Sequence, residues 1–252
     1  MYEKLLVVAA RGTDAKDDQA SIFSTQSYLR RRQHRYVEAL SLSNRAVALN
    51  ASDYYLVTRA LINEDQGNYN AALADFDRAL AQGNGPYWYY HRRSRAHTAA
   101  GHTEAAIADA SQSIKLNSKD PDGLVMRADA EMKADRDQEA LVDYSKALEM
   151  EPACPQALGG RAALYEKNGE HQKAIDDATK ALKSGHLKPA RHFDDDYKID
   201  VAGGKMPLTI VTYQIRCKAY KALEKGAQAA IDAAAATKGE QEWRRFINLI
   251  AN

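Results

Sequence analysis

The chain has 252 residues, a formal net charge of +1, 45% hydrophobic residues and 27% charged residues. This is the composition of an ordinary folded protein, and the balanced charge gives no global reason to expect nucleic acid or an anionic membrane as a partner. Two cysteines, Cys154 and Cys217, are too few for a disulfide framework or a metal-ligand cluster. The apolar run at residues 5–10 is too short to cross a bilayer, so we expect no membrane span.

An internal repeat of 34 residues is the strongest pattern in the chain. Ala72, Ala106, Ala140 and Ala174 follow one another at this interval. The same step relates three further series: Leu73, Ile107, Leu141 and Ile175; Ala79, Ser113, Ala147 and Ala181; and Leu80, Ile114, Leu148 and Leu182. Self-similarity at a fixed period of this length is typical of repeat architectures, in which each unit packs only on its neighbours.

Each repeat is predicted to contain two helices. In chain order, the repeats are expected at about residues 20–52, 53–86, 87–120, 121–154, 155–188 and 210–238. In the fourth repeat, helices are expected at 121–134 and 137–149, because the apolar residues of the second stretch fall on one helical face. Glycine-containing turns separate the helices of several repeats, and proline or glycine clusters separate successive repeats. The periodic alanines suit the closest contact between two antiparallel helices.

The sequence departs from the period at both ends and before the sixth repeat. Residues 185–208 interrupt it and carry His186, His192 and the acidic run 194–196, without recognised metal-ligand spacing. We expect a solvated acidic loop that is not needed for folding; the alternative is a lid over a binding groove. Trp243, Phe246, Ile247 and Ile250 share one helical face and predict a capping helix at 240–251, while Tyr2, Leu5, Leu6 and Ala9 are expected to cover the other end.

The fifth repeat resembles the tetratricopeptide repeat most clearly. Its motif is Leu158-Gly-Gly-Arg-Ala-Ala-Leu-Tyr165, followed by Gly169, Ala174 and Ala181. The resemblance covers about residues 20–238 and implies a single domain over 1–252. That domain would be an all-α, right-handed superhelical solenoid of antiparallel helix pairs with end-capping helices. The pentatricopeptide RNA-binding array is the nearest alternative, but its units usually run one residue longer and lack this alanine set.

An arginine and an aspartate recur at equivalent places, always 16 residues apart. The pairs are Arg59 and Asp75, Arg93 and Asp109, Arg127 and Asp143, Arg161 and Asp177, and Arg216 and Asp232. A guanidinium can bind a carboxylate through two parallel hydrogen bonds. We therefore predict an ion pair inside each helix pair, and we assign it to architecture rather than catalysis because it is repeated five times.

The resemblance implies that the first helix of each repeat lines a concave groove. The predicted partner-binding residues are Arg31, Arg32, Tyr54, Trp88, His91, Arg92, Arg95, Met126 and Met132. Cations beside aromatic rings suit a carboxylate-bearing segment, and methionine offers adaptable apolar contact. The pair Gly159-Gly160, inside a predicted helix, is interpreted as leaving room for a bound chain.

These patterns favour a scaffold or adaptor that binds an extended or helical peptide, acidic in character, from another protein. An RNA-binding helical array and an enzyme built on a solenoid are the alternatives. Nucleophile-elbow, phosphate-loop, His-Glu-x-x-His and Cys-x-x-Cys motifs are missing from the sequence, so we expect no enzyme activity, cofactor or metal. The balanced net charge favours a protein over a nucleic acid as partner. We expect a cytoplasmic location, or a periplasmic or secreted one if a signal segment has been removed.

Overall fold

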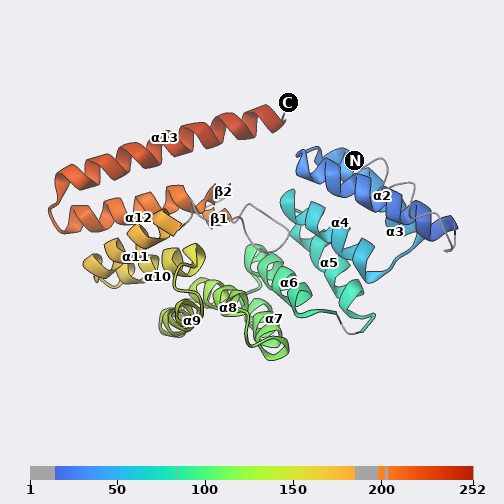
Figure 1. Ribbon diagram of the computed structural model, residues 1–252, viewed down its shortest axis with the longest axis horizontal. Coiled ribbons are helices and arrows are strands. Elements are labelled where there is room, and N and C mark those ends of the chain that lie inside the picture. The colour runs from blue at the N-terminus through green and yellow to red at the C-terminus, as the bar shows by residue number, and fades with distance from the viewer. Residues whose placement is uncertain (1–14, 84, 185–197, 202–203, 252) are drawn as a thin grey trace. The chain divides into compact units, whose positions relative to one another are not determined.

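The computed structural model describes residues 15–83, 85–184, 198–201 and 204–251 (Figure 1). The helices are α2 (Ala15–Arg32), α3 (Tyr36–Leu49), α4 (Asp53–Asp65), α5 (Tyr69–Leu80), α6 (Tyr87–Ala100), α7 (Thr103–Leu116), α8 (Pro121–Lys133), α9 (Asp137–Met150), α10 (Pro155–Lys167), α11 (His171–Ser184), α12 (Leu208–Ala222) and α13 (Gly226–Ala251). The strands are β1 (Lys198–Val201) and β2 (Gly204–Pro207). The predicted all-α array of helix pairs is confirmed, with one short β-hairpin added.

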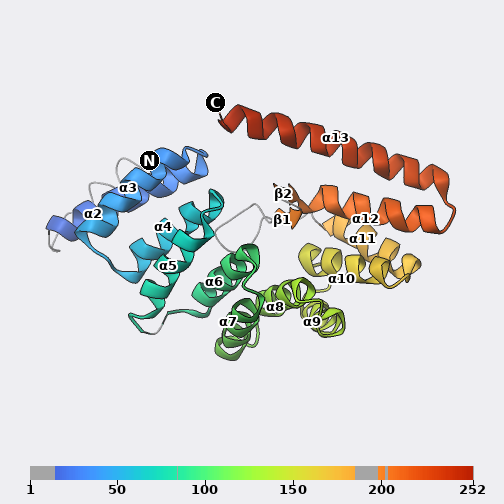
Figure 2. The same cartoon turned by 180° about the vertical axis from the view of Figure 1, so that it is seen from behind.

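The chain divides into two compact units, Met1–Gln112 and Ser113–Asn252, with the boundary inside α7. Unit 1 contains the pairs α2/α3, α4/α5 and α6/α7, in blue to green in Figures 1 and 2. Unit 2 contains α8/α9, α10/α11 and α12/α13, in green to red. The assignment of residues 1–252 to a single domain stays a prediction.

Small residues let the helices of each pair approach closely. In unit 1, Ala60 and Ala72 are fully buried on the facing sides of α4 and α5, and Leu56 and Phe76 fill the core beside them. In the α6/α7 pair the equivalent contact is stabilised by a hydrogen bond, in which the hydroxyl of Ser94 donates to the backbone oxygen of Ala106. Larger side chains at these contacts would push the helices apart.

Unit 2 repeats this arrangement. Its core gathers Leu124 and Val125 of α8, Tyr144 and Leu148 of α9, and Leu158 of α10. The alanines at the helix contacts are all fully buried: Ala140 and Ala174 of the 34-residue series, and Ala128 and Ala162 on the facing first helices. Within unit 2, the α8/α9 pair therefore buries its apolar residues together with those of the α10/α11 pair.

A left-handed backbone residue connects the two helices of each pair. This residue is glycine in three pairs, with φ of 76° at Gly67, 80° at Gly101 and 78° at Gly169. In the other three, His34, Asp135 and Glu224 adopt the same region, with φ of 58°, 56° and 56°. The glycine breaks predicted between helices are thus confirmed, and three pairs make the same turn without glycine, at a steric cost that glycine avoids.

Two parts of the C-terminal region differ from the prediction. Residues 198–207, expected in a loop, form an antiparallel hairpin in which Lys198 pairs with Pro207 and Val201 with Gly204, and the hairpin packs against α12 and α13. Alternating apolar residues before Gly-Gly are a hairpin signal that the loop interpretation overlooked. The predicted capping helix at 240–251 is not separate, because it is the last part of α13. A single Gly239 costs a helix only about 1 kcal/mol and does not end it.

Other predictions fall outside the described residues. They concern the N-terminal cap formed by Tyr2, Leu5, Leu6 and Ala9, and the histidines and acidic run of residues 185–197.

Candidate partner-binding surface

The five predicted arginine–aspartate ion pairs are all confirmed. In every pair Nε of the arginine donates to Oδ2 of the aspartate and Nη2 donates to Oδ1, at distances of 2.6–3.1 Å. The aspartate side chains are at most 8% exposed. The hydrogen bond to aspartate is the main reason that the pKa of Arg59, Arg93, Arg127 and Arg216 is raised, so these groups stay charged and are unsuited to proton transfer.

Four of these arginines also reach the preceding pair of helices. Nη1 of Arg59 donates to Asn44 of α3 at 3.0 Å, and Nη1 of Arg93 donates to Asp77 of α5 at 2.7 Å. In unit 2, Nη1 of Arg161 donates to Ser145 of α9 at 3.3 Å, and Nη1 of Arg216 donates to Thr179 of α11 at 3.1 Å. Each of these guanidinium groups thus joins three helices, which assigns it to the architecture and not to a binding site.

The predicted basic surface of unit 1 is partly neutralised by acidic residues. Nε of Arg31 donates to Asp65 at 2.7 Å, which ties α2 to α4. Nε of Arg95 donates to Oε1 of Glu64 at 2.5 Å, which ties α6 to α4, and the Glu64 side chain is only 1% exposed. Both acidic residues lie outside the predicted set. Arg95 and Glu64 are 31 residues apart, so the 34-residue period does not reveal their pairing.

Aromatic residues of unit 1 differ in how far they reach solvent. Tyr54 on α4 is 58% exposed, whereas Trp88 on α6 is half-buried against the core of the unit. The Trp88 ring meets Tyr89 edge to face, with centroids 4.3 Å apart. His91 lies in the same way beside Tyr87, with centroids 5.3 Å apart. Tyr54 is therefore the predicted aromatic residue that offers the most free ring surface.

The two other predicted cations of unit 1 lie at different depths. Arg32, in the last turn of α2, is exposed, and Arg92 of α6 is half-buried. Of the four predicted arginines, Arg31 and Arg95 thus belong to the ion pairs described above, and Arg32 is the most exposed.

In unit 2, the predicted methionines belong partly to the core. Met126 and Met132 of α8 are half-buried and pack on the apolar cluster around Leu158. The hydroxyl of Tyr144 reaches the same helix, where it donates to Asp129 over 2.5 Å and lies 3.2 Å from the sulfur of Met132. Met132 and Asp129 of α8 are therefore both in contact with the buried hydroxyl of Tyr144 from α9.

The interpretation of Gly159-Gly160 as room for a bound chain is wrong. A Cβ atom on Gly160 would lie 2.3 Å from Cζ of Tyr144, and one on Gly159 would lie 2.9 Å from Cδ1 of Leu208. Both glycines therefore make room for neighbouring side chains of the fold itself. The period gives no sign of this contact, because the residues 34 before and after Tyr144 are Ala110 and Ala178.

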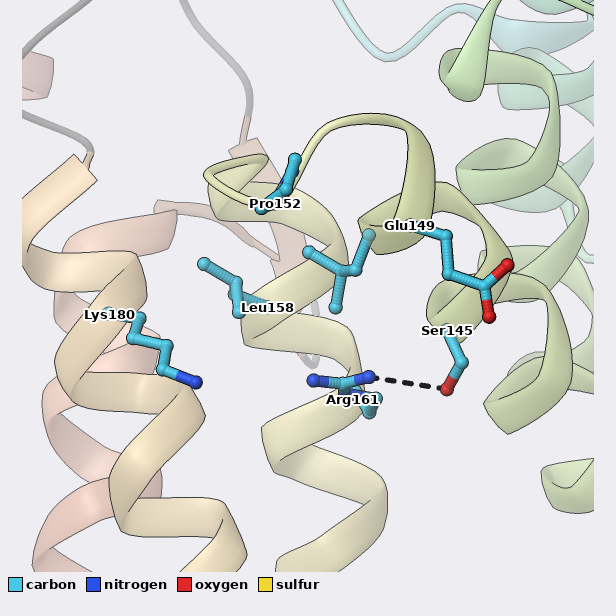
Figure 3. A pocket seen from close by; sticks show the side chains of 7 residues that line it. Ser145, Glu149, Pro152, Leu158, Arg161 and Lys180 are labelled. Carbon is cyan, nitrogen blue, oxygen red and sulfur yellow. Dashed lines mark hydrogen bonds between the residues drawn. The ribbon is translucent and has the colours of Figure 1, made fainter.

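A pocket of about 260 Å³ lies elsewhere in unit 2, between α9, α10 and α11 (Figure 3). It is lined by Ser145, Leu148, Glu149, Pro152, Leu158, Arg161 and Lys180. The ammonium of Lys180 points toward Arg161, and the hydrogen bond from Arg161 to Ser145 crosses one side. Its cations are balanced by Asp177, which pairs with Arg161, and by the exposed Glu149. No residue predicted to bind a partner lines this pocket.

Within the described parts of the chain, no group of three or more His, Cys, Asp or Glu side chains could hold a metal ion. His186, His192 and the acidic run 194–196, which lack recognised metal-ligand spacing, lie outside those parts. None of the described helices combines the length and apolar character that a bilayer crossing requires.

Comparison with known proteins matches the chain to solved structures only. No protein-family model matches it, and no curated protein does. A tetratricopeptide repeat protein from Parabacteroides merdae superposes with a TM-score of 0.70 at 19% identity, covering 99% of this chain and 91% of the other. PilF of Pseudomonas aeruginosa gives a TM-score of 0.67 at 12% identity, covering 92% of this chain and 99% of the other.

A third structure, YrrB, is described as a tetratricopeptide protein with an unusual peptide-binding site. Its TM-score is 0.51 at 16% identity, and the match covers 64% of this chain and 84% of YrrB. Identities this low establish a shared fold without establishing a shared function. Together with the 34-residue period and the paired helices, they confirm the resemblance: the chain has the tetratricopeptide-repeat fold.

Proposed function

We propose that the chain is a protein-interaction scaffold that binds a peptide segment of a partner protein on the first helices of its pairs. The observation that carries the proposal is Tyr54, a large aromatic side chain left 58% exposed on α4. Aromatic anchors with free ring surface are the residues that most often dominate the energy of an interface. The fold and the peptide-binding site named for YrrB support this assignment.

The candidate contacts are Arg31, Arg32, Tyr54, Trp88, His91, Arg92 and Arg95 in unit 1, and Met126 and Met132 in unit 2. We assign them unequal roles. Tyr54 supplies apolar contact, and Arg32 is exposed and suits an acidic residue of the peptide. Arg31 and Arg95, held by Asp65 and Glu64, position α2, α4 and α6 rather than bind directly.

The proposal includes a scaffold role rather than an enzymatic one, which is supported by the repeated geometry of the five Arg–Asp pairs, because it assigns those arginines to the architecture. A cytoplasmic location belongs to the proposal as well. Cys154 and Cys217 are both free and buried, and burial raises the pKa of the Cys154 thiol to about 11, so it stays protonated. Unpaired thiols fit a reducing compartment.

The test uses the whole chain as bait for a displayed library of random peptides. Selected peptides are labelled, and their dissociation constants are measured by fluorescence anisotropy for the wild type, Tyr54→Ala and Val142→Ala. Val142 is a matched control, because it is 50% exposed but lies on α9, a second helix. We expect Tyr54→Ala to weaken binding about tenfold or more and Val142→Ala to leave it unchanged.

Charge is tested separately. Arg32→Gln should slow association with acidic peptides, because an exposed charge acts mainly on the association rate constant. The difference in that rate constant between the variant and the wild type should shrink as salt is added. Equal binding by Tyr54→Ala and wild type would place the site elsewhere. Tight binding of a labelled homopolymer RNA that falls steeply with salt, with no peptide selected, would favour the RNA-binding alternative.

A further inference from the structure

Glu131 is a carboxyl group placed where ionisation is unfavourable. It lies near the C-terminal end of α8, and its side chain is only 10% exposed. Its Oε2 is buried and has no hydrogen-bond partner in the described part of the chain, while Oε1 lies 3.9 Å from Nε of Arg127. A helix C-terminus carries partial negative charge, which adds to the cost of a carboxylate there.

The guanidinium of Arg127, on the same helix as Glu131, is already engaged. Arg127 donates to both oxygens of Asp143, at 2.6 and 3.0 Å, and these are the distances of a full bidentate pair. At 3.9 Å, Glu131 is outside hydrogen-bond range of that group. When Glu131 is ionised, two carboxylates compete for one cation inside the α8–α9 pair.

The other charged groups around the site do not remove this conflict. Glu139 of α9 adds a negative charge, and Arg136 in the turn adds a positive one. Lys167, from α10, pairs with Asp137 at 2.6 Å and lies 3.8 Å from Asp135. The basic group that α10 brings to this turn is therefore taken up by the two aspartates.

We propose that Glu131 makes the α8–α9 pair a pH-sensitive element, closely packed when the carboxyl is neutral and loosened when it is ionised. Burial, and then the charge of Asp143, raises the pKa of Glu131 from 4.5 to about 7, while Arg127 acts in the opposite direction. The switch therefore operates in the neutral range, where few other carboxyl groups change charge.

The sign follows from proton linkage. The folded state holds the Glu131 proton up to about pH 7, whereas the unfolded chain releases it near pH 4.5. Between these values the folded state binds more protons, so raising the pH lowers the free energy of unfolding. Above about pH 7 both states are ionised and the loss is complete.

The equivalent residues of neighbouring repeats show that a carboxyl is not required at this position. His97 lies 34 residues before Glu131 and Tyr165 lies 34 residues after it. Tyr165 places its ring 5.7 Å from the guanidinium of Arg161. An aromatic ring thus packs beside the ion pair without a second negative charge, and the acidic side chain is peculiar to the fourth repeat among the repeats compared.

The experiment follows thermal unfolding of the whole chain from pH 5 to pH 9 in the wild type, Glu131→Gln and Glu131→Met. Methionine is included because a buried glutamine amide needs hydrogen-bond partners of its own. The control is Glu149→Gln, which removes the same charge from an exposed site on α9. We expect at least one Glu131 variant to raise the Tm at pH 8 by about 2 °C or more, with the gain shrinking toward pH 5.

Two direct measurements follow. The carboxyl ¹³C chemical shift of Glu131 should titrate near neutral pH. Amide hydrogen exchange in α8 and α9 should speed up from pH 6 to pH 8 by more than the intrinsic effect of pH. A Glu131 midpoint near 4.5, or a pH profile shared by both Glu131 variants, Glu149→Gln and the wild type, would overturn the proposal. These readouts do not depend on whether α8 binds a peptide.

Discussion

The phenol ring of Tyr144 lies directly over the backbone of Gly160, where a methyl group would stand 2.3 Å from Cζ and 2.5 Å from the hydroxyl oxygen. Replacing a glycine inside a helix by alanine usually stabilises the folded state by about 0.5–1 kcal/mol. At this position the change forces the ring away from Asp129 and out of a packed core. The tyrosine side chain and the helical glycine are therefore one packing unit shared by α9 and α10.

We predict that Gly160→Ala destabilises the chain by about 1–3 kcal/mol, the usual cost of overpacking. Gly159→Ala should cost less, because the nearest atom is the end of a flexible leucine, Cδ1 of Leu208 at 2.9 Å. Urea unfolding of both variants gives the comparison. Adding Tyr144→Ala to Gly160→Ala should cancel the specific penalty, and a double variant that shows no such coupling would contradict the stated cause.

We predict strong coupling between Arg216 and Asp232. Arg216 donates two hydrogen bonds of 2.7 Å to Asp232, and the two side chains are 17% and 2% exposed. A double-mutant cycle with Arg216→Met and Asp232→Asn should give about 1–3 kcal/mol. The exposed pair Lys173 and Glu170 is the control, with less than about 1 kcal/mol expected. Similar coupling energies in both cycles would mean that burial does not strengthen the Arg–Asp ion pairs.

Ala140→Leu should destabilise the chain by about 1–3 kcal/mol, while Ala134→Leu should be tolerated. Ala140 is fully buried where α9 meets α8, whereas Ala134 is half-buried at the end of α8. Thermal unfolding followed by circular dichroism checks the difference. Equal melting temperatures would refute the alignment of the repeats.

Glu224→Gly should stabilise the chain by up to about 1 kcal/mol. Glu224 connects α12 and α13 with φ of 56°, a region that costs an ordinary residue roughly 1–2 kcal/mol, whereas glycine enters it freely. The gain is partly offset by the greater freedom of glycine in the unfolded chain. Lys221→Gly, inside α12, is the matched control and should destabilise; a loss of stability in both variants would show that the turn gains nothing from glycine.

Contacts that recur with the 34-residue period are predicted well from the sequence. Four of the five Arg–Asp pairs and the alanines Ala72, Ala106, Ala140 and Ala174 recur at 34 residues, so several copies report the same contact and chance is excluded. Contacts that occur once are not visible in this way. Tyr144 over Gly160, and Glu64 beside Arg95, each join residues whose equivalents elsewhere are different, and only the packing brings them together.

The candidate surface was harder to predict than the fold for a related reason. Arg31, Arg92 and Arg95 look alike in the sequence, but their depth and partners depend on the neighbouring helix pair. Asp65 and Glu64 engage two of the three cations, and helical spacing alone does not report on side chains that approach from another repeat. At the C-terminus, the sixth repeat and the capping helix were predicted as separate elements, but the good helix formers on both sides of Gly239 carry α13 through it.

The arginines that join three helices also determine where the chain can be divided into repeats that can be moved or duplicated. A cut made before α10 separates Arg161 from Ser145, and a cut made before α12 separates Arg216 from Thr179. A cut between the two helices of a pair would separate the arginine from its aspartate, a larger loss. A repeat should therefore be duplicated or transplanted at a pair boundary only when the preceding pair has a hydrogen-bond acceptor on its second helix. That one polar residue decides which repeats of this array can be joined to one another.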